Sequence, residues 1–298
     1  MFSMRFWLVI GLGLSFTWMA WTESHAKPTV YVVNYPLQYF TERIGAERVQ
    51  VIFPAPADED PAFWKPDVKT IAAFQAADLI IINGATYAKW LKTASLPKAK
   101  MVDTSKGFKA NYVEVKDTIT HTHGPSGAHA HTGTAFTTWL DLQQAVHQAH
   151  AITAALSRLQ PEHKSAFERR HAELEQDLLA LDQRLKAIVA KQPTQPLIAS
   201  HPVYQYLAKR YGLNLQSVLW EPDVMPSNEQ WQALQSILKT HAATWMLWEG
   251  NPLPASVDKL RTLGVNSLVF DPCGKRPKQG DFLSVMQQNA DNLQLAFQ

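Results

Sequence analysis

Histidine is concentrated in one short segment of the chain. Residues 121–131 hold four of the 11 histidines as two His-X-His pairs on either side of a Gly/Pro-containing turn: His121, His123, His129 and His131. Neutral imidazole binds zinc, copper and nickel well, and a flexible loop can gather several imidazoles with little strain. We therefore expect a mobile loop that contacts transition metals. The pattern does not distinguish a scavenging loop from a tight site, and a solvated polar loop with incidental histidines is the alternative.

Acidic and imidazole side chains also recur directly after the predicted strands. Asp58, Glu59 and Asp60 follow the second predicted strand of the first half. In the second half, each of four predicted strands is followed by a potential metal ligand: His201, Glu221, Glu249 and Asp271. Several of these residues adjoin large aromatic side chains: Trp64, Trp220, Trp248 and Phe270. Carboxylates beside apolar walls are unfavourable unless paired or bound to a cation, and one imidazole with several carboxylates suits zinc or manganese.

Each carboxylate also has a purely structural explanation. Glu59 or Asp60 could cap the next helix, and Asp271 before Pro272 could form a turn. Their common position at strand ends in both halves favours a shared cation site, and the sequence leaves both interpretations open.

Alternating strand-like and helix-like segments would position these side chains. Short apolar runs predict strands at Thr29–Asn34, Val49–Phe53, Leu79–Asn83, Met101–Asp103, Leu197–Ser200, Leu215–Leu219, Thr244–Trp248 and Ser267–Phe270. Helical patterns lie at Leu37–Gly45, Pro66–Ala77, Tyr87–Thr93, Tyr204–Tyr211, Asn228–His241, Ala255–Leu263 and Phe282–Leu295. This alternation predicts two parallel sheets covered by helices, with a ligand cleft where the carboxyl ends of their strands converge.

A different kind of segment joins the two halves. Pro161 to Lys191 is charged, lacks Gly and internal Pro, and repeats apolar residues every three or four positions from Leu174 to Ile188. This pattern predicts an amphipathic helix about 45 Å long. The expected fold class is therefore α/β, with two lobes bridged by one long rigid helix.

The chain of 298 residues carries a formal charge of +2 and a single cysteine, Cys273. The charge gives no basic stripe for nucleic acid. One thiol excludes an intrachain disulfide and a Cys-rich zinc site, so metal binding must use imidazole and carboxylate. Cys273 adjoins Asp271, which makes it either an inert thiol or a further ligand.

The N-terminus has the pattern of an export signal. Arg5 precedes the apolar run Phe6 to Trp21, and Ser24 and Ala26 are the small residues of a cleavage site. The run has 16 residues, fewer than the roughly 20 that span a bilayer, so we expect cleavage after Ala26 rather than an uncleaved anchor. The expected product is a soluble periplasmic protein. The expected parts are a signal peptide 1–26, an N-terminal lobe 27–140, connecting helices 141–192 and a C-terminal lobe 193–298.

The order of several short motifs resembles the metal-specific solute-binding proteins of bacterial zinc/manganese ABC importers, in particular the zinc-uptake type with a His-rich loop. The resemblance covers nearly all of the mature chain. The motifs are Glu59-Asp60 before Lys65-Pro66-Asp67-Val68, a strand into Asn83-Gly84, the His-rich segment before Trp139-Leu140, His201-Pro202-Val203-Tyr204-Gln205-Tyr206, Tyr211-Gly212-Leu213 and Phe270-Asp271-Pro272. The resemblance implies two α/β lobes on one long helix, zinc or alternatively manganese as the carried ion, and an inner-membrane ABC permease as partner.

The family ligands carry over only in part. They fall on Asp60 (with Glu59 beside it), on Thr137, on Ser217 (with Glu221 one turn of chain away) and on Asp271, while His201 matches a frequent family histidine. Thr137 and Ser217 are poor ligands. The site that the resemblance implies combines Asp60, His201, Glu249 and Asp271, with Glu59 and Glu221 in reserve, and His131 could supply a missing imidazole.

Three functions follow for comparison. The first is an exported, monomeric zinc carrier without enzyme activity. The second is a zinc hydrolase, although the sequence lacks the His-Glu-X-X-His and Gly-X-Ser-X-Gly motifs. The third is a binding protein whose metal site has degenerated, with a Trp-lined cleft that holds a chelated or organic ligand.

Overall fold

A computed structural model describes residues 26–122 and 128–298, and it describes side chains outside 116–132. Two four-stranded parallel sheets form the lobes. The first has the order β2-β1-β3-β4, from β1 (Thr29–Val32), β2 (Gln50–Ile52), β3 (Leu79–Ile82) and β4 (Met101–Asp103). The second has the order β10-β9-β7-β8, from β7 (Pro196–Ala199), β8 (Asn214–Ser217), β9 (Trp245–Trp248) and β10 (Asn266–Val269). The predicted two-lobed α/β class is confirmed.

Helices cover the sheets at the predicted places: α1 (Tyr35–Gly45), α2 (Val68–Ala76), α5 (Gln205–Tyr211), α6 (Asn228–Thr240), α7 (Pro254–Thr262) and α8 (Phe282–Gln294). Local capping fixes several starts; for example, Asp67 accepts a hydrogen bond from the backbone of Thr70 at 2.7 Å. Short 3₁₀ turns occupy Ala46–Arg48, Lys98–Lys100, Lys106–Asn111, Thr138–Leu140 and Leu295–Phe297. The predicted helix at Tyr87–Thr93 is wrong. That segment forms only a 3₁₀ turn over Lys89–Lys92, with Trp90 as its one buried residue, which is too short a repeat to bury a helical face.

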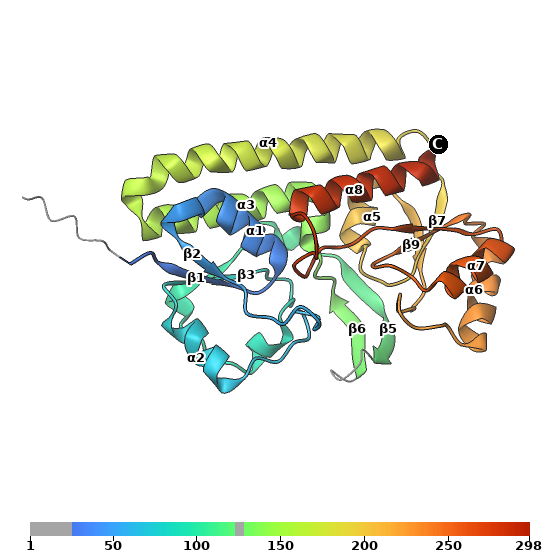
Figure 1. Ribbon diagram of the computed structural model, residues 1–298, viewed down its shortest axis with the longest axis horizontal. Helices are drawn as coiled ribbons and strands as arrows, with labels where there is room; N and C mark the ends of the chain where they lie inside the picture. The colour runs from blue at the N-terminus through green and yellow to red at the C-terminus, as the bar shows by residue number, and fades with distance from the viewer. Residues whose placement is uncertain (1–25, 123–127) are drawn as a thin grey trace, which may run out of the picture.

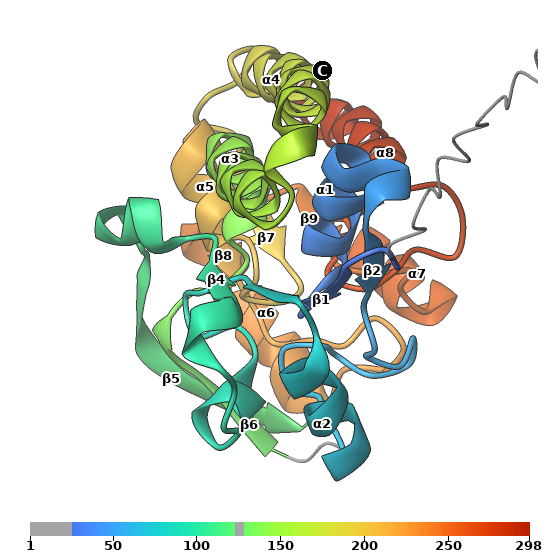
Figure 2. The ribbon, with the colours of Figure 1, turned by 90° about the vertical axis from the view of Figure 1, so that its left-hand side faces the viewer.

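The long connecting helix is confirmed. The helix α3 (Leu142–Leu159) turns through Pro161–His163 into α4 (Lys164–Val189), whose 26 residues span about 39 Å. Figure 1 shows α4 running over both lobes, and Figure 2 shows it bundled with α3, α8 and α1. The predicted apolar stripe from Leu174 to Ile188 is buried. One hydrophobic core runs from the N-terminal sheet through α3 and α4 to α8, so the lobes share a packed interior.

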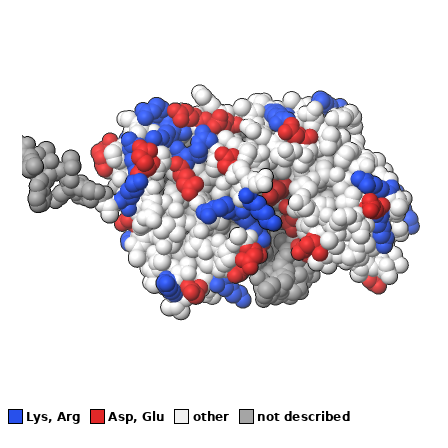
Figure 3. All heavy atoms as spheres, in the orientation of Figure 1, with Lys and Arg blue, Asp and Glu red and all other residues white. Residues whose placement is uncertain are grey.

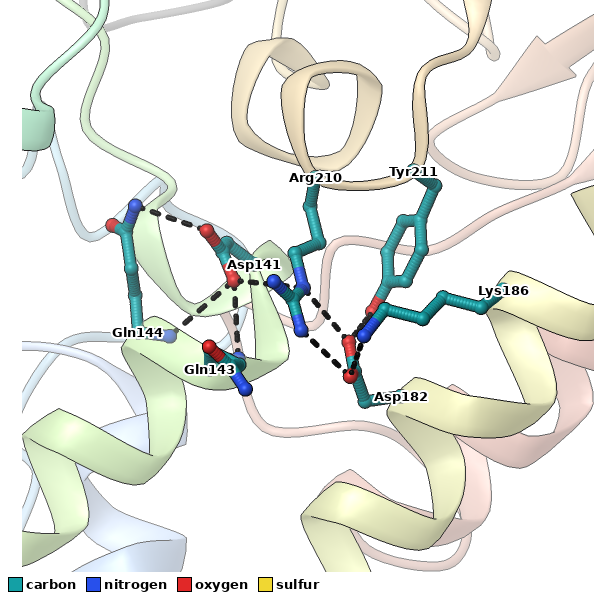
Figure 4. A network of polar contacts seen from close by, with 7 residues as sticks. All are labelled: Asp141, Gln143, Gln144, Asp182, Lys186, Arg210 and Tyr211. Carbon is teal, nitrogen blue, oxygen red and sulfur yellow. Dashed lines mark hydrogen bonds and ion pairs between the residues drawn. The ribbon is translucent and has the colours of Figure 1, made fainter.

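A polar network fastens α4 to the C-terminal lobe (Figure 4). Asp182 on α4 is fully buried and accepts hydrogen bonds from Arg210 at 2.7 and 2.9 Å and from Tyr211 at 3.0 Å. Lys186 lies 2.9 Å from the same carboxylate, and Arg210 also reaches Asp141, which caps α3. Burial alone would raise the pKa of Asp182, but the hydrogen bonds from Arg210 and Lys186 outweigh burial and lower it. The carboxylate therefore stays ionised and ties the two helices to α5.

The His-rich segment differs from the expected loop. β5 (Glu114–Thr122) and β6 (Ala128–Thr134) pair antiparallel, with the backbone of His121 opposite His129 and that of Ile119 opposite His131. The β-branched residues in Glu114–Thr122 favour a strand, and the Gly and Pro residues come between the two strands in the sequence. In Figure 1 this hairpin extends between the lobes, on the side away from α4. His123 and the remainder of 123–127 lie outside the described residues.

The predicted signal segment also lies outside the described residues, which begin at Ala26. None of the helices within the described ranges is both long and apolar enough to span a bilayer. Acidic and basic side chains are interspersed over the face drawn in Figure 3. The residue limits proposed above for the two lobes and the connecting helices stay predictions.

Candidate metal centre

Three of the predicted ligands meet at the carboxyl edge of the C-terminal sheet. His201, Glu221 and Glu249 follow β7, β8 and β9, and their nearest ligand atoms all lie within 4.8 Å of one another. His201 Nδ1 is 3.7 Å from a carboxylate oxygen of Glu221 and 3.9 Å from one of Glu249. In the described part of the chain, no other group of three His, Cys, Asp or Glu residues is as close.

The parallel ladder explains why these three residues meet. Backbone hydrogen bonds continue past the last strand residues: Ser200 donates to Leu247 at 2.8 Å, and Trp220 donates to Ser200 at 2.7 Å. The chain segments that leave β7, β8 and β9 therefore stay side by side for two or three residues. Because all three strands run in the same direction, the first polar residue beyond each one reaches the same edge.

The tryptophans beside these carboxylates belong to the core and not to the cleft. Trp220 and Trp248 are 2% and 0% exposed, and the ring of Trp220 packs 4.6 Å from that of Trp231. Successive residues in an extended segment point to opposite sides, so burying Trp220 and Trp248 turns Glu221 and Glu249 away from that core. The expectation of a Trp-lined cleft, in which the third function would hold its ligand, is therefore wrong.

Asp271 follows β10 and is held firmly in place. One carboxylate oxygen accepts a hydrogen bond from the backbone of Cys273 at 2.7 Å. The Asn289 side chain bonds both the amide and the carbonyl of Asp271, at 2.9 and 2.7 Å. The next residues cross to the N-terminal lobe, where Gly274 accepts from the amide of Tyr35 at 3.1 Å. Asp271 therefore lies where the lobes join, and it also forms the predicted turn.

Asp60 approaches the cluster from the N-terminal lobe. Its carboxylate accepts a hydrogen bond from Ala62 at 2.9 Å and so shapes its own loop, while Asp67 caps the following helix. The charge of Asp60 acts on Glu249 across the lobe boundary. The helix-cap explanation for Asp60 is therefore wrong, and the structure brings this residue toward the cluster. The structure offers no contact that assigns Glu59 a role.

The carboxylates destabilise one another's ionised forms. Burial is the main cause that raises the pKa of Glu249 from 4.5 to about 8, and the charges of Glu221, Asp60 and Asp271 raise it further, against an opposing effect of Lys275. Burial likewise raises the pKa of Asp271. A bound divalent cation would reverse this repulsion. The arrangement thus has the electrostatics of a cation site, and its imidazole and carboxylates suit zinc.

Two positions that match family ligands have structural contacts. The Thr137 hydroxyl donates to the carbonyl of Val203 at 2.5 Å and links the segment before α3 to the loop after His201. Ser217 ends β8 and pairs with Ala199. Cys273 is 2% exposed, and burial raises the pKa of its thiol, which is therefore neutral at pH 7.

Sequence reasoning missed three residues around the site. Tyr204 is buried and donates to the carbonyl of Phe270 at 2.6 Å, next to Asp271. Asn289 on α8 positions Asp271, and Lys275 supplies a positive charge toward Glu249. The His201-Pro-Val-Tyr motif could have pointed to Tyr204. No local pattern marks Asn289, which reaches the site only through the packing of α8.

Comparison with known proteins identifies a family. Residues 30–296 match the family model described as ZnuA, zinc-uptake complex component A, periplasmic. A Bacillus subtilis relative, named high-affinity zinc uptake system protein ZnuA, is 27% identical over 300 residues, which cover 97% of this chain and 93% of the relative.

A Streptococcus pneumoniae relative, named zinc-binding lipoprotein AdcA, is 23% identical over 278 residues. That match covers 90% of this chain and only 55% of the relative, so this chain spans about half the length of that protein. The fold matches the crystal structure of the metal-dependent lipoprotein YcdH from Bacillus subtilis with a TM-score of 0.76 at 24% identity, covering 90% of this chain and 98% of that one.

Proposed function

The chain belongs to the family of periplasmic zinc-uptake components, and on that premise we propose that it captures zinc between its two lobes and delivers the ion to a membrane ABC permease. Its relatives in Bacillus subtilis and Streptococcus pneumoniae are named for zinc uptake and zinc binding. A carrier needs a site that binds the ion and releases it unchanged, and no enzymatic step is part of the proposal.

The observation that carries the proposal is the cluster of His201, Glu221 and Glu249, with the charge of Asp60 acting on it from the other lobe. We assign His201, Glu249, Asp60 and Asp271 as zinc ligands, with Glu221 as a further ligand. An imidazole ligand favours zinc over manganese, which prefers oxygen ligands, so manganese is the second candidate ion.

We propose that the hairpin histidines form a second, weaker zinc-gathering element. His121 and His129 are backbone neighbours in the antiparallel pair, and the hairpin extends between the lobes (Figure 1). Imidazoles on this hairpin would raise the local zinc concentration near the cleft without forming the tight site.

We propose export by a signal peptide cleaved after Ala26, and a monomer in the periplasm that docks on the permease. The shared core and the Asp182 network limit the lobes to small movements. Recognition of the loaded form would therefore depend on slight closure and on ordering of loops at the cleft.

The test is titration of metal-stripped protein with zinc and manganese in competition. The proposal predicts one tight equivalent of zinc, which manganese displaces only at large excess. Absence of any binding beyond the weak capacity of the hairpin would refute it. If manganese bound as tightly as zinc or more tightly, manganese would become the proposed ion, and the proposed ligands would stay the same.

A further inference from the structure

Two histidines outside the cleft face each other between the neighbouring helices α3 and α4. His150 lies nine residues before the end of α3 at Leu159, and His171 lies seven residues after the start of α4 at Lys164. Both helices rise about 1.5 Å per residue, so the two positions lie at similar distances along the helices from the turn. Their imidazole rings are 5.7 Å apart between centroids, at an interplanar angle of 68°.

This separation fits two imidazoles on one ion. With zinc–nitrogen bonds of about 2.0 Å and a tetrahedral angle, two ring centroids lie roughly 5 Å apart. The observed centroid separation exceeds this value by less than an ångström, and the ring nitrogens would have to turn toward the ion. His150 is exposed, so its side chain can adopt another rotamer without disturbing the core.

The two ring nitrogens of His171 have different surroundings. Nδ1 faces the carboxylate of Glu175 at 3.9 Å, one turn further along α4. Nε2 is buried and has no hydrogen-bond partner among the residues that the structure describes. A buried ring nitrogen without a partner is unfavourable and requires an explanation, such as an ion.

We propose that His150 and His171 form a second zinc site between α3 and α4, in which Nε2 of His171 binds the ion and Glu175 orients the ring through Nδ1. Because Nε2 of His171 is buried, the ion and the water that completes its coordination would reach it through a change of rotamer of the exposed His150 side chain. A ligand histidine that donates its other ring N–H to a carboxylate is the usual arrangement at zinc sites. The ion would join the two helices on which both lobes rest, at a place separate from the interlobe cluster.

The experiment uses the full chain with the hairpin histidines replaced, H121N/H123N/H129N/H131N, and the cleft loaded with one equivalent of zinc. Calorimetric titration with further zinc should then show a second equivalent. H150Q and H171Q should each weaken that equivalent at least about tenfold, since even an outer-shell partner contributes about 10–100-fold. The matched control H147Q removes another exposed histidine of α3, one turn earlier, and should leave both equivalents unchanged.

Glu175 is a positioning residue, and E175Q tests its role. It should weaken the second equivalent about tenfold without changing the melting temperature of the metal-free protein. No second equivalent in the starting variant, or a second equivalent retained in H150Q, would overturn the proposal. H150Q decides even if H171Q fails to fold, because His150 is exposed. The first equivalent of zinc reports on the cleft and the second on the proposed site between α3 and α4. The titration therefore shows which of the two sites fails to bind zinc.

Discussion

Replacing Glu249 by glutamine should stabilise the metal-free protein while weakening zinc binding. Glutamine keeps the shape of the side chain and removes the charge that burial and three neighbouring carboxylates oppose. With a pKa of 4.5 in the unfolded chain and about 8 in the folded one, Glu249 keeps a proton at pH 7 that it loses on unfolding. This difference destabilises the folded state by about 3 kcal/mol at pH 7 relative to a side chain that does not titrate.

The raised pKa of Glu249 decides whether the free energy of unfolding rises or falls with pH. Below pH 4.5 both states hold the proton and the effect vanishes, whereas between pH 4.5 and 8 the folded state binds more protons than the unfolded state. The contribution of Glu249 to the free energy of unfolding therefore falls as pH rises, with a slope of up to about 1.4 kcal/mol per pH unit. Zinc binding requires the carboxylate, so it should release close to one proton from Glu249 at pH 7.

The assay is guanidinium unfolding of metal-free wild type and E249Q at pH 5, 6, 7 and 8, with zinc titrations of both proteins. The stability difference should grow with pH in favour of E249Q, and zinc affinity should fall at least about tenfold. E162Q, which removes an exposed carboxylate before α4, is the control and should change neither quantity. Equal pH slopes in wild type and E249Q, or a less stable E249Q at pH 7, would refute the electrostatic account of the site.

Three further predictions concern the imidazole ligand, the hairpin and the spine. H201A should weaken the tight zinc equivalent at least about tenfold, or roughly 1.4 kcal/mol, in a calorimetric titration; unchanged affinity would remove His201 from the site. Deleting 121–131 should leave the tight equivalent and abolish weaker ones in equilibrium dialysis, whereas loss of all binding would place the site in the hairpin. D182A should lower the free energy of unfolding by about 3 kcal/mol, because it leaves Arg210 without its buried partner. Zinc affinity of D182A should stay within about twofold of wild type, since Asp182 lies outside the cluster.

Strand ends were the most informative part of the sequence. Short apolar runs marked every strand of both sheets, and parallel topology then placed His201, Glu221 and Glu249 at one edge. What the sequence could not give was the direction in which adjacent side chains point. The sequence predicted that the aromatic residues line the cleft, but Trp220 and Trp248 fill the core of the C-terminal lobe. The adjoining carboxylates of Glu221 and Glu249 lie beside His201 instead.

Contacts that depend on packing between distant segments were beyond local patterns. Asn289 reaches Asp271 only because α8 lies against the end of β10, and Thr137 is drawn into a hydrogen bond with Val203. The hairpin was missed because the histidines and the Gly and Pro residues of 121–131 suggested a loop, although the β-branched residues on its first strand favour extended backbone.

Anomalous diffraction at the zinc absorption edge, from crystals grown with one equivalent of zinc, tests the central claim most directly. The account predicts one strong peak at the carboxyl edge of the C-terminal sheet, within bonding distance of His201 and Glu249 and bordered by Asp60 from the other lobe. A peak located only at the hairpin or between α3 and α4, with none at His201, would contradict it.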